Sequence, residues 1–249
     1  MLKKRVLLIP IIILIVMIPL VPYFIYTFDK SAELHSGHAC LALTFDDGVE
    51  NHYDEVFMIL KERGHKATFF IIANITSWRG DLILTDDKIL EMQNEGFEIG
   101  SHSLTHPLFT SLSPEEVVRE LKESKQNLES RGLEITSFSF PFSNYSEETL
   151  LEANKYYEIV RDNYILNSNG NVYNAQPIYS ESKMEEVCER IKEAKARNKL
   201  LIFVFHKVQN NPLFWDISKE DFIKLLECAE ENDLEINTLK KCIAIVDES

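Results

Sequence analysis

Residues 40–48 read CLALTFDDG, a mostly apolar run that ends in two adjacent carboxylates and a glycine. Such a run is typical of a strand covered on both faces, because a fully buried strand has no polar side. The glycine permits a tight turn directly after the two aspartates. The sequence therefore predicts a buried strand over 40–45 whose carboxyl end presents Asp46 and Asp47.

Further apolar runs of strand length follow, and segments with helical period separate most of them. The predicted strands are 40–45, 67–72, 97–100, 135–140, 157–160, 200–205 and 234–238, and the predicted helices are 54–63, 86–95, 114–130, 146–155, 183–197 and 218–231. Alternating strands and helices favour an α/β domain with a parallel sheet, either a barrel or an open doubly wound sheet. Periodicity alone does not distinguish these two architectures.

Polar side chains follow three of the predicted strands. Asp46 and Asp47 end the first, His102 and His106 lie after the third, and His206 follows the strand over 200–205. The carboxyl ends of parallel strands meet at one edge of the sheet, so these groups are expected to gather there. One carboxylate with two imidazoles can bind a divalent metal, which leaves a second carboxylate and a third histidine for proton transfer. Taken singly, each motif has a plainer explanation as a turn or a structural histidine.

Two of these motifs resemble a known family. The run TFDDG over 44–48 and the run HSLTH over 102–106 are similar to those of the polysaccharide deacetylases of the NodB-homology type, carbohydrate esterase family 4. The segments 66–70, 96–100 and 204–206 agree as well, so the likeness covers roughly residues 40–243. It implies a deformed (β/α) barrel with seven or eight parallel strands. It also implies a metal-dependent deacetylase that acts on acetylated sugars.

The resemblance implies a role for each motif residue. Asp46 would be the catalytic base and His206 the acid, while Asp47, His102 and His106 would hold the metal. Zn²⁺ is the expected ion, with Co²⁺, Ni²⁺ or Fe²⁺ as alternatives. In the family a backbone N–H donates to the oxyanion, and that N–H corresponds to Phe142 here.

The third family motif departs from the usual pattern. Ser139 stands where the family has an arginine, and Ser143 stands where it has a glycine. Members that act on β-1,6-linked poly-N-acetylglucosamine resemble this chain in having a small residue at the first position. Arg161 could supply the missing guanidinium and its neighbour Asp162 could orient His206, although an exposed ion pair is the simpler explanation of these two residues.

Two tryptophans are candidates for stacking on a sugar ring. Trp78 follows the second predicted strand and Trp215 lies in the loop after His206, where simple loop packing is the alternative. The acidic residues of the helix over 114–130 are expected to form a solvated face. They include Glu115, Glu116, Glu120 and Glu123.

Charge is distributed unevenly along the chain, whose formal net charge is −14. Residues 1–30 carry four basic side chains and one acidic one, and the remainder carries 22 basic and 39 acidic residues, net −17. So acidic a domain has no basic face for phosphates, which argues against nucleic acid as a partner. No protein partner is predicted.

Residues 6–26 are uncharged and follow three basic residues. As a helix they would span ~31 Å, enough to cross a bilayer. The positive-inside bias then places residues 1–30 as a cytoplasmic basic end and membrane anchor, 31–37 as a linker and 38–246 as an extracytoplasmic deacetylase domain. A cleaved signal peptide is the alternative, and it would make the protein secreted.

Four cysteines allow three pairings if all are oxidised, and buried free thiols are an equal alternative. The leading functional prediction is removal of acetyl groups from N-acetylglucosamine-containing polysaccharide outside the membrane. An O-acetyl esterase, a small-amide hydrolase and a non-catalytic carbohydrate-binding relative are the alternatives.

Overall fold

The computed structural model describes residues 38–162 and 172–247. Within them a nine-stranded sheet has the order β8-β7-β6-β5-β2-β1-β10-β9, with β13 paired to β1, and every ladder is parallel. The strands are β1 (Cys40–Phe45), β2 (Thr68–Ile71), β5 (Glu98–Ser101), β6 (Ser137–Ser139), β7 (Ile159–Asp162), β8 (Val172–Asn174), β9 (Gln176–Pro177), β10 (Leu200–Phe205) and β13 (Glu235–Asn237).

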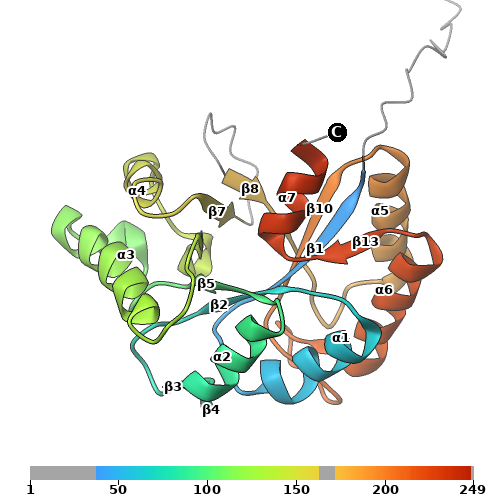
Figure 1. Cartoon of the computed structure of the whole chain (residues 1–249), viewed down its shortest axis with the longest axis horizontal. Helices are drawn as coiled ribbons and strands as arrows, with labels where there is room; N and C mark the ends of the chain where they lie inside the picture. Colours follow the sequence, from blue (N-terminus) through green and yellow to red (C-terminus); the bar gives the residue numbers. More distant parts are fainter. Residues whose placement is uncertain (1–37, 163–171, 248–249) are drawn as a thin grey trace, which may run out of the picture. The chain divides into compact units, whose positions relative to one another are not determined.

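Helices surround this sheet (Figure 1). They are α1 (Met58–Arg63), continuous with a π-helix over His52–Phe57, then α2 (Asp86–Asn94), α3 (Pro114–Glu129), α4 (Glu147–Ala153), α5 (Met184–Ala196), α6 (Lys219–Glu231) and α7 (Leu239–Asp247). Two short pairs lie apart from the main sheet: β3 (Ser77–Trp78) with β4 (Asp81–Leu82), and β11 (Val208–Gln209) with β12 (Ile217–Ser218). The seven predicted strands and six predicted helices are therefore confirmed, with shifts at their ends.

The predicted barrel is a curled half-barrel whose edge strands are β8 and β9. No ladder joins these two edges among the described residues, yet Ala175 alone separates them in the chain. The sheet must therefore curl until its edges approach each other, although backbone hydrogen bonds do not close it. Apolar runs did not predict β8 and β9, because their sequences, VYN and QP, contain no apolar run.

The alternate residues of β1 face two different hydrophobic clusters. Leu41, Leu43 and Phe45 belong to the cluster shared with α1 to α6, whereas Cys40 and Ala42 pack with residues of α7. Helix α7 thus covers the opposite face of the sheet, and it is a helix that the sequence did not predict. A strand buried on both faces explains why residues 40–45 show no alternation of polar and apolar side chains.

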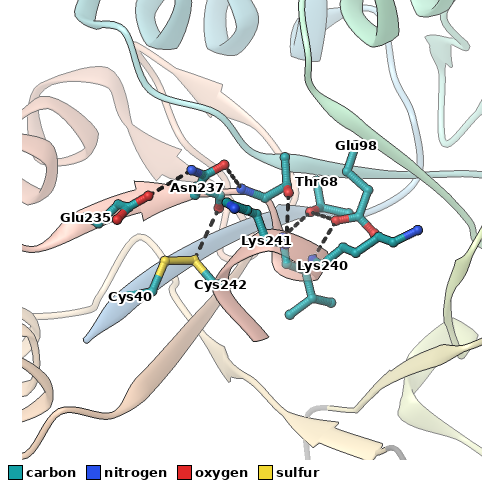
Figure 2. Close-up of a disulfide and its surroundings, with 10 residues drawn as sticks. Cys40, Thr68, Glu98, Glu235, Asn237, Lys240, Lys241 and Cys242 are labelled. Carbon is teal, nitrogen blue, oxygen red and sulfur yellow. Dashed lines mark hydrogen bonds between the residues drawn. A yellow bond between two sulfur atoms is a disulfide. The ribbon is translucent and has the colours of Figure 1, made fainter. Parts of the chain in front are cut away.

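Helix α7 begins on groups supplied by neighbouring strands (Figure 2). The backbone N–H of Leu239 donates to the hydroxyl of Thr68 at 2.8 Å, and that of Lys240 donates to the carboxylate of Glu98 at 2.9 Å. Thr68 also donates to Glu98 at 2.9 Å. These contacts satisfy the first amides of α7 and place a negative charge at its amino end, where the helix dipole favours one.

All four cysteines are paired. Cys40 and Cys242 join β1 to α7, as Figure 2 shows, and Cys188 and Cys228 join α5 to α6. Spacing in the sequence could not select these pairs, because the partners are 202 and 40 residues apart. The structure therefore contains two disulfide bridges and not the buried free thiols that were the alternative.

We expect the double variant Cys40→Ala/Cys242→Ala to lose about 2–4 kcal/mol of unfolding free energy, because its bridge closes a long loop in the unfolded chain. Loop-closure entropy predicts a loss smaller by about 1.4 kcal/mol for Cys188→Ala/Cys228→Ala, whose loop is shorter. Urea denaturation of the full chain measures both. Equal losses would contradict the loop-length argument.

The predicted membrane segment, residues 6–26, lies outside the described residues, as do the linker 31–37 and the basic end. Among residues 38–162 and 172–247, none of the helices combines the length and the apolar character needed to cross a bilayer.

Candidate active site

The predicted polar residues converge on one cleft of about 240 Å³ at the carboxyl ends of the strands. Those that line it are Asp46, Asp47, His102, His106 and His206. The predicted stacking residues Trp78 and Trp215 line it as well, as does Phe142, predicted as the backbone oxyanion donor. The sequence did not predict Arg79 and Tyr179, which also face the cleft. Tyr179 comes just after β9, the two-residue strand that apolar runs could not reveal.

The turn after β1 positions its two carboxylates through backbone geometry. The N–H of Asp46 still bonds to the carbonyl of Phe205 at 2.9 Å, and Asp47 then adopts a φ of 79°. A β-carbon at Gly48, whose φ is 69°, would lie 2.7 Å from the side chain of Ile71. Only glycine fits this close approach, so the turn that separates the two carboxylates depends on Gly48.

Asp47, His102 and His106 form a group that can hold a metal ion. Each offers one ligand atom, and these atoms lie within 4.8 Å of one another. The Asp47 Oδ1 atom is 3.2 Å from Nε2 of His106 and 3.7 Å from Nε2 of His102. Across residues 38–162 and 172–247 the structure contains no second such group of histidine, cysteine and acidic residues.

The hydrogen bond of His102 tests whether these residues fit a metal. Its Nδ1 donates to the carbonyl of Ser139 at 2.8 Å, so Nε2, which faces Asp47, is left with a free lone pair. Burial lowers the pKa of His102 to about 4, which keeps the ring neutral. Neutral imidazole with its other nitrogen bonded to a carbonyl is the usual state of a metal ligand. The donor set therefore suits a divalent cation such as Zn²⁺.

Glu120 supports the loop that carries the two histidines, contrary to the sequence prediction of a solvated side chain. It is only 2% exposed, and its carboxylate accepts the backbone N–H groups of Leu104 and Thr105, both at 2.9 Å. The hydroxyl of Thr105 donates to it at 2.6 Å. The signal was present in the sequence, because position 120 falls on the stripe of buried residues at 117, 121, 124 and 128 of α3.

We expect Glu120→Gln to weaken zinc binding by roughly 10- to 100-fold, the range found when groups that orient metal ligands are changed. The neutral amide cannot accept both backbone N–H groups with the strength of a carboxylate. Calorimetric titration of the metal-free full chain with Zn²⁺ measures the affinity. Glu123→Gln, an exposed position on the same helix, is the matched control, and equal affinities for the two variants would contradict the role of Glu120.

Arg161 contacts the candidate base Asp46. Its guanidinium, 1% exposed, forms an ion pair with Asp46 and also donates to the hydroxyl of Ser139. Burial of Asp46 acts to raise the pKa of its carboxyl, but Arg161, together with His102 and His206, outweighs burial and holds that pKa below its usual value. Asp46 is therefore an ionised carboxylate at neutral pH.

Asp162 has a hydrogen-bond partner in Tyr145. Its carboxylate accepts a hydrogen bond from the hydroxyl of Tyr145. Its predicted role in orienting His206 stays a prediction. The alternative explanation, an exposed ion pair, is wrong about exposure, because Arg161 and Asp162 are both buried.

Aromatic rings form the walls of the cleft. The rings of Trp78 and Phe142 lie 4.2 and 4.6 Å from the ring of His106, and the ring of Trp215 lies 6.1 Å from that of His206. About half of the Phe142 and Trp215 side chains is exposed, so solvent reaches both rings. These faces are available to an apolar sugar face, and the stacking role stays a prediction.

Comparisons with known proteins agree on one family. The polysaccharide deacetylase family model matches residues 35–158, about half of the chain. YxkH of Bacillus subtilis strain 168, assigned by its name to the polysaccharide deacetylases, is 33% identical over 117 residues, which are 47% of this chain and 41% of YxkH. The peptidoglycan-N-acetylglucosamine deacetylase PgdA of Listeria monocytogenes is 30% identical over 115 residues, 45% of this chain and 23% of PgdA.

The solved structure of a family 4 carbohydrate esterase from Bacillus anthracis has the same fold. The TM-score is 0.59 at 22% identity, and the alignment covers 84% of each chain. The segment matched in YxkH and PgdA is less than half of either protein. Family model, relatives and fold together show that this chain carries a polysaccharide deacetylase domain of the NodB type, carbohydrate esterase family 4.

Proposed function

We propose that this domain is a metal-dependent hydrolase that removes acetyl groups from N-acetylglucosamine-containing polysaccharide. One observation carries the proposal. Two carboxylates and three histidines from β1, β5 and β10 line a single cleft, and one carboxylate and two of the histidines lie within metal-binding distance of one another. The cleft therefore contains candidates for the metal site, the base and the acid that this hydrolysis requires.

Each polar residue has a distinct part in the proposed reaction. A divalent cation held by Asp47, His102 and His106 would supply Lewis-acid polarisation and make water a better nucleophile. Asp46, held ionised by Arg161, accepts the proton of the attacking water.

The remaining steps concern the departing amine and the developing oxyanion. His206, which is partly exposed in the cleft, donates a proton to the amine as the bond to the acetyl carbon breaks. The Pro141–Ser143 turn places Phe142 at the cleft with a φ of 56°, and its backbone N–H is proposed to donate to the oxyanion.

The charge of the domain favours a neutral substrate. The chain after residue 30 has a net charge of −17, which disfavours an anionic polymer and tolerates poly-N-acetylglucosamine, whose deacetylated product gains amines. PgdA acts, by its name, on the N-acetylglucosamine of peptidoglycan. The small residue Ser139 favours β-1,6-linked polymer within this class.

We propose that the domain works outside the cytoplasmic membrane, held there by residues 6–26 as an anchor. Two disulfides support an oxidising compartment, because such bridges are rare in reducing cytoplasm. The uncharged segment and the basic residues before it support the orientation.

Acetate release by the zinc-loaded full chain, purified in mild detergent, tests the function. We expect release from N-acetylglucosamine oligomers, faster with β-1,6 than with β-1,4 linkage, and little from acetylated xylan. Faster release from xylan would instead support an O-acetyl esterase on the same site. Binding of oligomers without any release would support a non-catalytic carbohydrate-binding relative.

A further inference from the structure

The turn after β1 and the turn after β10 are joined by the side chains of two consecutive residues, Asn51 and His52. Both residues follow the TFDDG motif, at the start of the π-helix His52–Phe57. Their partners are the backbone groups of His206 and Val208, 154 to 157 positions away in the sequence. We call Asn51 and His52 the clamp.

Asn51 pairs with the backbone of Val208 as a neighbouring strand would. Its Nδ2 donates to the Val208 carbonyl and its Oδ1 accepts the Val208 N–H, both at 3.0 Å. One side chain therefore satisfies both backbone groups of a buried residue of β11. The segment just after His206 is thus held from the side of β1.

His52 holds the backbone of His206 itself. Its Nε2 lies 2.5 Å from the His206 carbonyl oxygen, and a carbonyl can only accept, so Nε2 carries the proton. Nδ1 of His52 is buried and has no hydrogen-bond partner within the described part of the chain, as expected of its unprotonated nitrogen. Burial lowers the pKa of His52 to about 4, which keeps this neutral tautomer at working pH.

Packing restricts the His52 ring to this orientation. The ring is fully buried, and its centroid lies 5.7 Å from that of Phe45 and 5.6 Å from that of Phe69. In contrast, the ring of His206 is partly exposed and lies 6.1 Å from the ring of Trp215. A shift of the His206 backbone would therefore move this ring within the cleft.

We propose that Asn51 and His52 are positioning residues that fix the proton-donating His206 relative to the base Asp46. The inference rests on the proposed function, in which His206 protonates the leaving amine. Asp46 and the clamp share one short turn, so the clamp ties the acid to the same segment that carries the base. Small displacements of a reacting group cost large factors in rate, and a short tether prevents them.

Variants of His52 test the proposal in the zinc-loaded full chain. We expect His52→Leu, which removes the donor, to reduce kcat on N-acetylglucosamine oligomers by roughly 10- to 100-fold with little change in KM. His52→Gln should recover most of this loss, because its amide nitrogen can donate where Nε2 did. Val56→Ala, a buried position of the same π-helix, is the matched control for lost stability and should keep kcat.

The leaving group separates positioning from general loss of structure. The nitrophenolate of 4-nitrophenyl acetate departs without a proton, so the His52→Leu loss should shrink to less than about threefold on this ester if the clamp acts through the acid. Equal losses on amide and ester would overturn the proposal. So would weaker zinc binding in step with the loss of kcat.

Hydrogen exchange tests the clamp without activity. We expect the Val208 amide to exchange at least about tenfold faster in Asn51→Ala, because its acceptor is gone, and an unchanged rate would overturn the clamp. Wild-type protein that releases no acetate from any substrate would overturn the proposed function instead. Active wild-type protein with an unchanged kcat in His52→Leu would overturn the positioning role alone.

Discussion

Replacing Asp46 by asparagine is expected to slow acetate release by at least about a hundredfold, the lower end of what removal of a general base costs. Asparagine keeps the shape of the side chain but cannot accept the proton of water. Zinc should still bind, because Asp47, His102 and His106 are unchanged. Steady-state rates on N-acetylglucosamine oligomers, measured together with the zinc content of the purified variant, check both expectations.

The same variant should also be less stable. Arg161 is 1% exposed, and without Asp46 its buried charge loses its counterion. Removing one partner of a buried ion pair typically costs about 3–5 kcal/mol, so the melting temperature must be measured before rates are compared. Asp221→Asn, at the start of α6, is the control carboxylate and should keep the rate within about twofold. A wild-type rate in the Asp46→Asn protein would show that Asp46 is not the base.

Loss of a metal ligand is expected to abolish acetate release altogether. In His106→Ala the group keeps only Asp47 and His102, so the dialysed protein should contain almost no zinc. Chelation of wild-type zinc should have the same effect on activity, and added Zn²⁺ should restore it only in the wild-type protein. A reaction that requires Lewis-acid polarisation cannot proceed at a useful rate without the cation.

Thermal unfolding gives a second readout of the same prediction. A ligand that binds only the folded state raises the melting temperature, so zinc should stabilise the metal-free wild-type chain by ~4 kcal/mol at 1,000 times its Kd. His106→Ala should show almost none of this gain. His65→Gln, a histidine paired with Glu230 at the surface, should keep it. If His106→Ala binds zinc with wild-type affinity, Asp47, His102 and His106 are not the ligands.

Much of the fold could be predicted because burial leaves a direct record in the sequence. The run over 40–45 is apolar throughout, and the structure buries it between α7 and the other helices. β8 and β9, with the sequences VYN and QP, lie in no apolar run and so leave no such record. Helix α7 was not predicted either.

The residues of the candidate site were likewise predicted only in part from the sequence. Asp46, Asp47 and the histidines were found because each follows a predicted strand, and parallel strands bring their carboxyl ends together. Glu120 and His52 were missed because their roles depend on backbone groups of distant segments. Nothing local in a helix or a turn indicates which carbonyl or amide will lie opposite.

The sequence by itself determined the order of strands and helices, the family motifs and the chemical character of the site, because these follow from local residue pattern. Only the tertiary structure decided that the sheet curls without closing, that Cys40 pairs with Cys242, and that Arg161 reaches Asp46. The two contacts, Cys40 with Cys242 and Arg161 with Asp46, join residues 202 and 115 positions apart. Their proximity is a property of how the strands pack, and strand packing is set by the whole core and not by any one segment.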